Sequence, residues 1–281
     1  AGYFVQPGMD WLDLFIGSDG TLCIFVSICL KLLPRPNAFF SGVLFFEKEE
    51  FCWELTSKIK LINFVSPCSL EYFDRFSLEL LREKYPNIPV QAEAALFFEE
   101  DVADQKDYDA TLEVWIKFLA DKNILLDESW FAQDQNDVLV FHEFRHQIPM
   151  LVNEKNSRAG REKIGTDMAV PDKFFNDMMI FYNKTLFGKG LPYVIFGHLG
   201  DNHLHINLLP DSSQQKLAES LYDELARKII SWDGTVSAEH GIGKKKKKYF
   251  YEMVGKENIE DLKRIKNALD PQKRLGRGNI F

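Results

Sequence analysis

The sequence predicts an α+β fold with a ferredoxin-like antiparallel sheet that helices cover on one face. Short segments of alternating apolar and polar residues are typical of half-buried strands, and segments with apolar residues at helical spacing separate them. Some neighbouring strands are joined only by tight turns, which favours antiparallel pairing. The chain has 281 residues, 46% of them apolar, and its 24 phenylalanines predict a large core.

The first 36 residues form a segment that is rich in glycine and turn residues, with a helix-like stretch near 9–16. The apolar run at 21–33, "TLCIFVSICLKLL", predicts one or two buried strands. The sequence "PRPN" at 34–37 then interrupts the chain with two prolines, which is typical of a connector. We therefore expect a boundary there, with one part at 1–36 and a second domain at 37–281.

Strands and helices alternate along the second domain. Strands are predicted where apolar residues alternate or form short runs, at 38–50, 90–101, 163–169, 192–199 and 203–210. The segment 67–84 is predicted to be a helix because its apolar residues Leu70, Phe73, Phe76 and Leu80 have helical spacing. The other predicted helices are at 48–61, 105–122, 128–156, 172–188, 212–231 and 257–269.

Charge and cysteine content exclude some classes of function. A net charge of −8 and a pI near 5.4 argue against nucleic acid as a partner. The longest apolar run, at 22–30, is too short to span a bilayer, so we expect no transmembrane segment. No cationic leader with a cleavage site opens the sequence, and the four cysteines have no CxxC spacing, so we expect a cytoplasmic protein with thiols in its core.

The segment "VIFGHLGDNHLHINLLP" at 194–210 contains three of the six histidines. A two-residue turn at 201–202 would make His198 and His205 a directly opposed cross-strand pair, with Cβ atoms roughly 4.5–5.5 Å apart on one face. Asn207 follows two residues later and shares that face, as does His203 if the strand is regular. This geometry lets two imidazoles converge on one metal ion.

The loop "SAEHGIG" at 237–243 supplies the best third ligand. Its glycines let the backbone fold tightly and approach a ligand closely. His198, His205 and Glu239 form a two-histidine, one-carboxylate set, which suits Zn²⁺, Mn²⁺ or Fe²⁺ with open coordination positions, and His240 would remain a free base beside the metal. The alternatives are a histidine pair that is satisfied in the core or exposed at a sheet edge, and a Glu-His pair that is simply solvated.

The run "KKKKK" at 244–248 follows this loop directly. It is interpreted as a solvated helix face, because long lysine stems can cover apolar surface. The alternative is that the run draws an anionic substrate toward the loop.

Several segments together resemble a known family. "GHLGDNHLHIN" (197–207), "GTVSAEHGIG" (234–243) and "DPQKRLGRGNIF" (270–281) are similar to the C-terminal half of FAD-linked oxidases of the vanillyl-alcohol-oxidase superfamily. The branch they most resemble is that of D-lactate, glycolate and D-2-hydroxyglutarate dehydrogenases. "AGYFVQPGMDWLDLFIGSDGTL" (1–22) resembles the last part of the FAD-binding domain, with its GSEGTLG signature, so 1–36 is interpreted as a remnant of that domain.

The resemblance implies roles for individual residues. The metal ligands of the family fall on His198, His205 and Glu239, and its catalytic base falls on His240. Asn207 matches a substrate-contacting asparagine, and Arg145 in "FRHQIP" resembles the arginine that grips a substrate carboxylate, a role that bidentate pairing favours. The residues of the signature that would contact the FAD cofactor are Gly17, Ser18, Gly20 and Thr21.

The sequence departs from the family pattern at several positions. Asn202 and His203 stand where the Gly-Asp-Gly-Asn motif has its second glycine and its asparagine. Cys23 and Val26 replace a usual glycine and threonine, and Gly276-Arg277 replaces Asn-Pro. The glycine-rich pyrophosphate loop of the family is not in the sequence. We therefore expect a fragment that binds FAD mostly through an N-terminal FAD-binding domain of the same protein and is inactive alone.

The function that the resemblance implies is oxidation of a small D-2-hydroxy acid with metal assistance and hydride transfer to FAD. Two other classes stay open at this point. One is a metal-dependent hydrolase, although no HExxH helix is present. The other is a non-catalytic module that binds a carboxylate. The expected partners are the 2-hydroxy acid and the FAD-binding domain, and a homodimer is left open.

Overall fold

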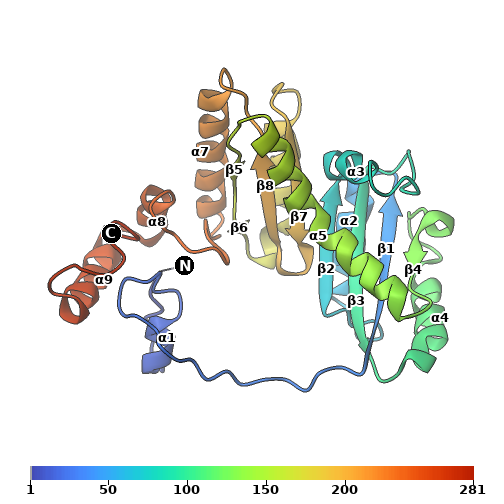
Figure 1. The fold of residues 1–281 in the computed structure, drawn as a ribbon, viewed down its shortest axis with the longest axis horizontal. Coiled ribbons are helices and arrows are strands. Elements are labelled where there is room, and N and C mark those ends of the chain that lie inside the picture. The colour runs from blue at the N-terminus through green and yellow to red at the C-terminus, as the bar shows by residue number, and fades with distance from the viewer. Residues whose placement is uncertain (1) are drawn as a thin grey trace. The chain divides into compact units, whose positions relative to one another are not determined.

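The computed structural model describes residues 2–281, which divide into two compact units. The sheet unit comprises residues 33–165 and 186–219, and the tail unit comprises residues 2–32, 166–185 and 220–281. The sheet unit is α+β with an antiparallel sheet, as the sequence predicts (Figure 1). No helix among residues 2–281 is both long enough and apolar enough to cross a membrane.

Seven strands of the sheet unit form one sheet in the order β4-β1-β3-β2-β7-β8-β5, and all neighbouring pairs are antiparallel. Along the chain a helix lies between each consecutive pair of the first four strands, so their order is β-α-β-α-β-α-β. The strands are β1 (Ala38–Phe46), β2 (Ser69–Asp74), β3 (Ala94–Val102), β4 (Trp130–Phe131), β5 (Ile164–Gly165), β7 (Tyr193–His198) and β8 (His203–Leu208).

Helices cover both faces of this sheet, whereas the sequence predicts that they cover one. On one face, Trp115 of α4 (Tyr108–Leu119) stacks on Phe98 of β3, with ring centroids 3.9 Å apart. On the other face, Phe144 of α5 (Gln135–Arg158) packs against Phe73 of β2 at 5.2 Å. Figure 1 shows α5 across the front of the sheet and α2 (Glu49–Ile59) behind it. Aromatic rings therefore supply much of the core on both sides.

The helix predicted at 67–84 is wrong in its first half. Residues 69–74 are the central strand β2, and α3 (Arg75–Leu81) begins only after Asp74, whose side chain accepts a hydrogen bond from the Ser77 amide at 2.8 Å. Because a central strand is buried on both faces, its apolar residues need not alternate, and their spacing can mimic that of a helix. Burial also raises the pKa of Asp74 to about 7.

Two other predictions are also corrected. The segment 21–33 is extended but is not a strand, and Ile24, Val26 and Leu32 are 76%, 94% and 80% exposed. An apolar run forms a strand only when another strand pairs with its backbone, and the described residues supply no such pairing here. The helix predicted at 128–156 begins at Gln135, after the capping residue Asp134, and residues 130–131 belong to β4.

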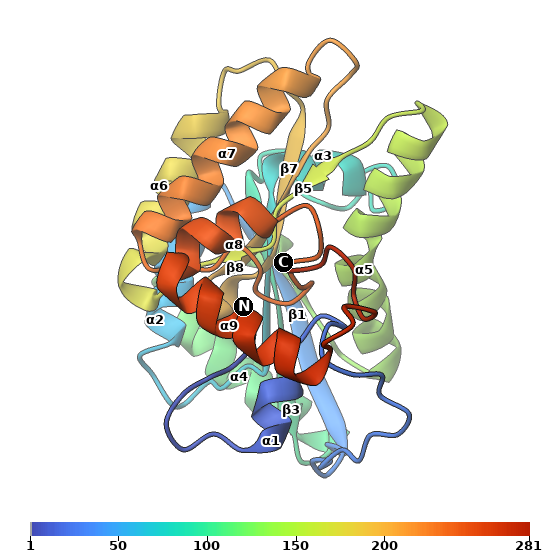
Figure 2. The same cartoon turned by 90° about the vertical axis from the view of Figure 1, so that its left-hand side faces the viewer.

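The tail unit contains several helices, the two-residue strand β6 and an irregular C-terminal segment. Figures 1 and 2 both show α8 beside α9. The Lys266 ammonium ties the segment together, because it donates to the carbonyls of Thr21 (2.6 Å) and Leu275 (3.0 Å) and pairs with Asp270. The elements are α1 (Trp11–Phe15), β6 (Met168–Ala169), α6 (Phe175–Leu186), α7 (Gln215–Ser231, from Ser220 on), α8 (Lys247–Val254) and α9 (Lys256–Leu269).

Candidate functional site

The hairpin β7–β8 has a longer turn than the sequence predicts. Phe196, not His198, lies opposite His205 in the register. The turn is a short 3-10 helix at Leu199–Asp201, followed by Asn202 in the left-handed conformation with φ 53°. The predicted pairing is therefore displaced by two residues. Because side chains alternate with a period of two, an even displacement keeps every side chain on its predicted face.

Three imidazoles consequently gather on one face of the hairpin. The ring centroids of His198 and His203 are 5.3 Å apart, those of His198 and His205 are 5.8 Å apart, and those of His203 and His205 are 4.6 Å apart. Each ring offers a nitrogen that lies within 4.8 Å of the nitrogens offered by the other two. The hairpin alone thus presents three potential metal ligands.

Gly197 makes room for one of these rings. Its φ of 133° is a conformation that residues with a side chain rarely adopt. A Cβ atom at this position would lie 3.1 Å from Cδ2 of His205 and 3.1 Å from the carbonyl oxygen of His203. The glycine of the "GH" pair is therefore required both by the backbone and by the packing of His205.

Glu71 is a functional candidate that the sequence reasoning missed. It lies on β2 opposite His198, is buried, and accepts a hydrogen bond from Nδ1 of His198 at 2.8 Å. A carboxylate on Nδ1 orients the ring and leaves Nε2 as the ligand atom. The local signal was an acid between apolar residues in "LEYF", but the helix predicted there concealed that this acid lies on the face with the histidines.

Arg145 extends from α5 toward the same carboxylate. Its Nη2 atom lies 2.5 Å from Oε1 of Glu71, and its guanidinium lies over the ring of Phe97, 5.9 Å from the centroid. A guanidinium has five N–H donors, and Glu71 occupies only part of this fork. Arg145 can therefore be held by Glu71 and still donate to a ligand.

Arg145, Glu71 and His198 line a pocket of about 350 Å³ within the sheet unit. The pocket also contains Lys60, whose Nζ donates to the Asn202 side chain at 2.7 Å. Cys68 lines it too, but burial raises the pKa of this thiol to about 12 and keeps it protonated. The pocket therefore offers cationic groups and an imidazole, not a reactive thiolate.

Asn207 lies on the same face of β8, opposite Val194. It is buried, and its Oδ1 would be 3.0 Å from a Cβ atom at Gly165. Gly165, which pairs with Asn207 in the sheet, thus leaves space for the amide. The predicted substrate contact is therefore close to the histidines but shielded from solvent.

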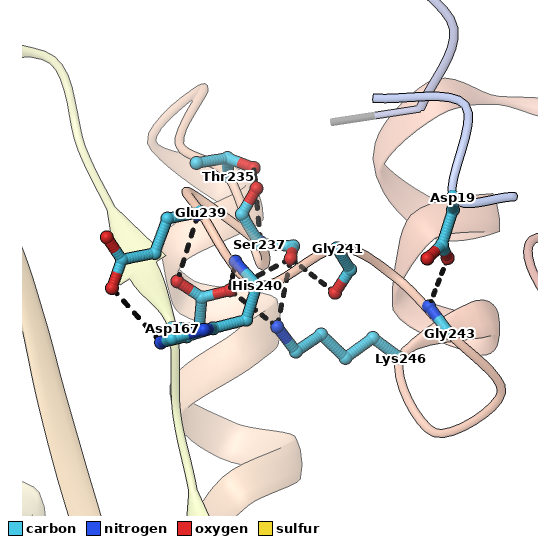
Figure 3. Close-up of polar contacts among 9 residues, drawn as sticks. All are labelled: Asp19, Asp167, Thr235, Ser237, Glu239, His240, Gly241, Gly243 and Lys246. Carbon is cyan, nitrogen blue, oxygen red and sulfur yellow. Dashed lines mark hydrogen bonds and ion pairs between the residues drawn. The ribbon is translucent and has the colours of Figure 1, made fainter. Parts of the chain in front are cut away.

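In the tail unit, Asp167 organises the loop that carries Glu239 and His240 (Figure 3). Its buried carboxylate accepts hydrogen bonds from the backbone amides of Glu239 at 3.2 Å and His240 at 3.0 Å. It also accepts from Ser237 Oγ at 2.9 Å and from Lys246 Nζ at 2.6 Å. One buried carboxylate thus fixes the backbone of both predicted functional residues.

Lys246 departs from the predicted solvated lysine face. Its side chain is only 14% exposed and contacts both Asp167 and Ser237. Lys244 and Lys245, by contrast, are exposed. One lysine of the run is therefore a structural ion-pair partner of the loop.

The side chains of Glu239 and His240 lie against each other, with Oε1 and Nε2 3.0 Å apart (Figure 3). These side chains are 42% and 64% exposed, so both are accessible to a ligand. Ligand atoms of Asp167, Glu239 and His240 lie within 4.8 Å of one another. The predicted base is thus in direct contact with the predicted carboxylate ligand.

The residues predicted to contact FAD form a tight turn after α1. Gly17 and Gly20 have φ values of 77° and 67°. The amides of Ser18 and Thr21 donate within the turn, to the carbonyls of Phe15 and Ser18, so they are not available to a phosphate. The Ser18 hydroxyl, however, is buried and has no hydrogen-bond partner. A buried polar atom of this kind fits a contact to a bound cofactor.

The structure thus brings the predicted residues together in two sets. His198, His205, Asn207 and Arg145 share one face of the sheet unit, and Glu239 and His240 share one loop of the tail unit. The joining of Glu239 to the two histidines stays a prediction.

The chain is similar in sequence to several oxidoreductases. It is 28% identical to "Glycolate oxidase subunit GlcD" of Bacillus subtilis, over 98% of this chain and 57% of that protein. It is 28% identical to "Probable D-lactate dehydrogenase, mitochondrial" of Danio rerio, over 98% and 54%. It is 27% identical to "D-2-hydroxyglutarate dehydrogenase, mitochondrial" of Rattus norvegicus, over 95% and 49%. The chain spans about half the length of these curated relatives.

Solved structures share the fold. An alkyldihydroxyacetonephosphate synthase matches with a TM-score of 0.61 at 13% identity, over 97% of this chain and 50% of that one. A 4-ethylphenol oxidase from Gulosibacter chungangensis matches with a TM-score of 0.57 at 15% identity, over 90% and 55%. The family model described as "FAD linked oxidases, C-terminal domain" matches residues 35–280. The chain therefore belongs to the FAD-linked oxidase family and carries its C-terminal domain.

Proposed function

We propose that this chain is the substrate- and metal-binding part of a FAD-dependent enzyme that oxidises a small D-2-hydroxy acid of the lactate, glycolate or 2-hydroxyglutarate type. The observation that carries the proposal is the cluster of imidazoles beside Asn207 and the Arg145 pocket. The reaction class rests on the relatives, which are named for oxidation of glycolate, D-lactate and D-2-hydroxyglutarate.

The donor set of the hairpin fits a divalent metal. Imidazole nitrogens are preferred ligands of Zn²⁺ and Fe²⁺, and a carboxylate such as Glu239 extends the choice to Mn²⁺. Glu71 supplies the outer hydrogen bond that histidine ligands usually have. We propose His198, His205 and Glu239 as the ligands. A bound cation would supply positive charge that stabilises the deprotonated hydroxyl of the substrate.

FAD would act as the hydride acceptor, held mainly by a FAD-binding domain of the same protein. The buried Ser18 hydroxyl favours a cofactor contact at the turn 17–21. The amides of Ser18 and Thr21 donate hydrogen bonds to carbonyls within the turn. The turn would therefore contribute to cofactor binding, but the FAD-binding domain would have to supply most of the contacts.

The side chains of this chain would have distinct tasks. Arg145 would bind the substrate carboxylate, because its guanidinium lines the pocket and presents donors that match a carboxylate. Asn207 would orient the substrate from the face that the histidines share. His240 would accept the hydroxyl proton at Nδ1 while its Nε2 keeps the contact with Glu239, or at Nε2 once that contact opens.

The test uses the complete flavin-loaded protein with Glu239→Gln. The amide keeps the shape of the carboxylate but removes its charge, so metal content and turnover of D-lactate, glycolate and D-2-hydroxyglutarate should both fall sharply. The exposed Glu257→Gln on α9 is the matched control and should change neither. Unchanged metal content and turnover in Glu239→Gln would refute the assignment. Turnover of none of these acids by the wild-type protein would refute the substrate class.

A further inference from the structure

We propose that His203 is a third imidazole ligand of this metal site and that it makes the site more selective for Zn²⁺ over Mn²⁺ than the family motif would. The proposal rests on the proposed metal site, and it adds a ligand at a position where the family motif has asparagine. The motif Gly-Asp-Gly-Asn reads Gly200-Asp201-Asn202-His203 in this chain.

The geometry of the hairpin supports a ligand at this position. His203 begins β8 and has the same strand parity as His205, so both rings project from one face. Its ring lies 4.6 Å from that of His205 and 5.3 Å from that of His198. All three offered nitrogens lie within 4.8 Å of one another without any contribution from the tail unit.

The turn is built so that this histidine can reach the cluster. Asn202 adopts the left-handed conformation that the motif glycine would adopt without strain, and asparagine tolerates it better than most residues. Lys60 holds the Asn202 side chain at 2.7 Å. The two departures from the motif, Asn202 and His203, are therefore adjacent. Asn202 keeps the backbone in the conformation from which the His203 side chain projects toward the other two histidines.

Burial argues for a specific role of His203. The residue is only 5% exposed, whereas His198 and His205 are half-buried. The offered nitrogens of the three rings are close enough together for one cation to accept all of them.

The third nitrogen has a consequence for metal choice. Imidazole sites bind Zn²⁺ more tightly than Mn²⁺, and carboxylate, carbonyl and water ligands suit Mn²⁺ better. Replacing the amide of the motif with an imidazole therefore widens the difference between the two metals. It also fills a coordination position, so fewer positions stay open for a ligand.

Zn²⁺ bound to the 281-residue chain tests the proposal without any flavin or turnover. X-ray absorption of the zinc-loaded wild-type chain counts the imidazoles around the metal, and three are expected. A count of two or fewer would overturn the proposal. This measurement needs no variant, so a folding defect of a mutant cannot obscure it.

His203→Asn, which restores the residue of the motif, is the matched variant. Its Zn²⁺ affinity should fall at least about tenfold, and its Mn²⁺ affinity should change less. Tenfold is the smallest loss of metal affinity that is typical when an outer-shell hydrogen-bond partner is removed, and a direct ligand should matter at least as much. His146→Asn, at an exposed histidine of α5, should leave both affinities unchanged. The metal-free melting temperature of each variant separates loss of a ligand from loss of the fold.

The outcomes distinguish the two proposals. If His198→Asn abolishes Zn²⁺ binding and His203→Asn does not change it, the third ligand is refuted and the metal site stands. If neither variant changes Zn²⁺ binding, the metal site itself is refuted, and the third ligand with it. A third outcome is that His203→Asn loses Zn²⁺ selectivity and the wild-type protein turns over none of the three hydroxy acids. This outcome would support His203 as a ligand and refute the substrate class.

Discussion

The histidine hairpin and the loop that carries Glu239 hold their functional side chains by different means. The hairpin places His198, His203 and His205 through strand periodicity, and the ladder between β7 and β8 fixes their face. The loop has no regular structure, and the buried carboxylate of Asp167 fixes its backbone through side-chain hydrogen bonds.

This difference predicts how each region fails. A strand keeps its geometry when one side chain changes, because many backbone hydrogen bonds define it. A loop that depends on one buried ion pair loses its geometry when either partner is removed, because the remaining charge is left without compensation. Changes around the hairpin should therefore reduce metal affinity, and changes behind the loop should reduce stability.

The largest effect is expected from Lys246→Met, which breaks the ion pair behind the loop. The long apolar side chain fills the space of the lysine stem but leaves the Asp167 carboxylate buried without its cation. Loss of one partner of a buried pair costs about 3–5 kcal/mol, and chemical denaturation should show a decrease of that size. Lys245→Met, one residue away and exposed, should stay within about 0.5 kcal/mol of wild type.

A double-mutant cycle sharpens this test. Asp167→Asn combined with Lys246→Met removes both charges, so the double variant should recover part of the stability that Lys246→Met loses. Equal stability of Lys246→Met and Lys245→Met would mean that the loop does not depend on the ion pair, and the contrast with the hairpin would disappear.

The next effect is expected from Glu71→Gln, which tests the hairpin. The amide removes the negative charge that orients His198 and offsets Arg145. Loss of an outer-shell carboxylate typically lowers metal affinity about 10- to 100-fold, and titration with Zn²⁺ measures this. Glu79→Gln, at an exposed glutamate of α3, is the control. A lower melting temperature with unchanged Zn²⁺ affinity would assign Glu71 a structural role only.

The same contrast explains what the sequence could predict. The shared face of His198, His205 and Asn207 was predicted although the turn was not, because an error of two residues in register does not change the face. Local periodicity encodes this information. The α+β class and most helices of the sheet unit could be predicted for the same reason.

Long-range contacts could not be predicted in this way. Asp167 meets the amides of residues 239 and 240 across more than seventy positions, and no local pattern connects them. Glu71 was missed because the spacing of Leu70 and Phe73 fits a helix as well as a buried strand. The exposed segment 21–33 was predicted as strands because periodicity cannot reveal whether a pairing strand exists.

The smallest effect is expected from Gly197→Ala, which tests how the hairpin accommodates His205. The new methyl group would meet the ring at 3.1 Å, and the backbone has a φ of 133°. Gly188→Ala is the matched control, because it also has positive φ, 72°, but has nothing within 4 Å of the added Cβ. The difference between the two variants reports the contacts of the added Cβ together with the less accessible φ of 133°, and we expect Gly197→Ala to be less stable than Gly188→Ala by about 1 kcal/mol.

The Zn²⁺ affinity of the same two variants completes the comparison. Displacement of the His205 ring should weaken Zn²⁺ binding in Gly197→Ala and leave it unchanged in Gly188→Ala, which lies outside the hairpin. If both variants lose equal stability and keep full affinity, positive φ alone explains the glycine at 197. Zn²⁺ binding would then tolerate a displaced His205 ring. The alternation of side chains along the strand would determine the face on which the ligand lies, but not the exact position of its ring.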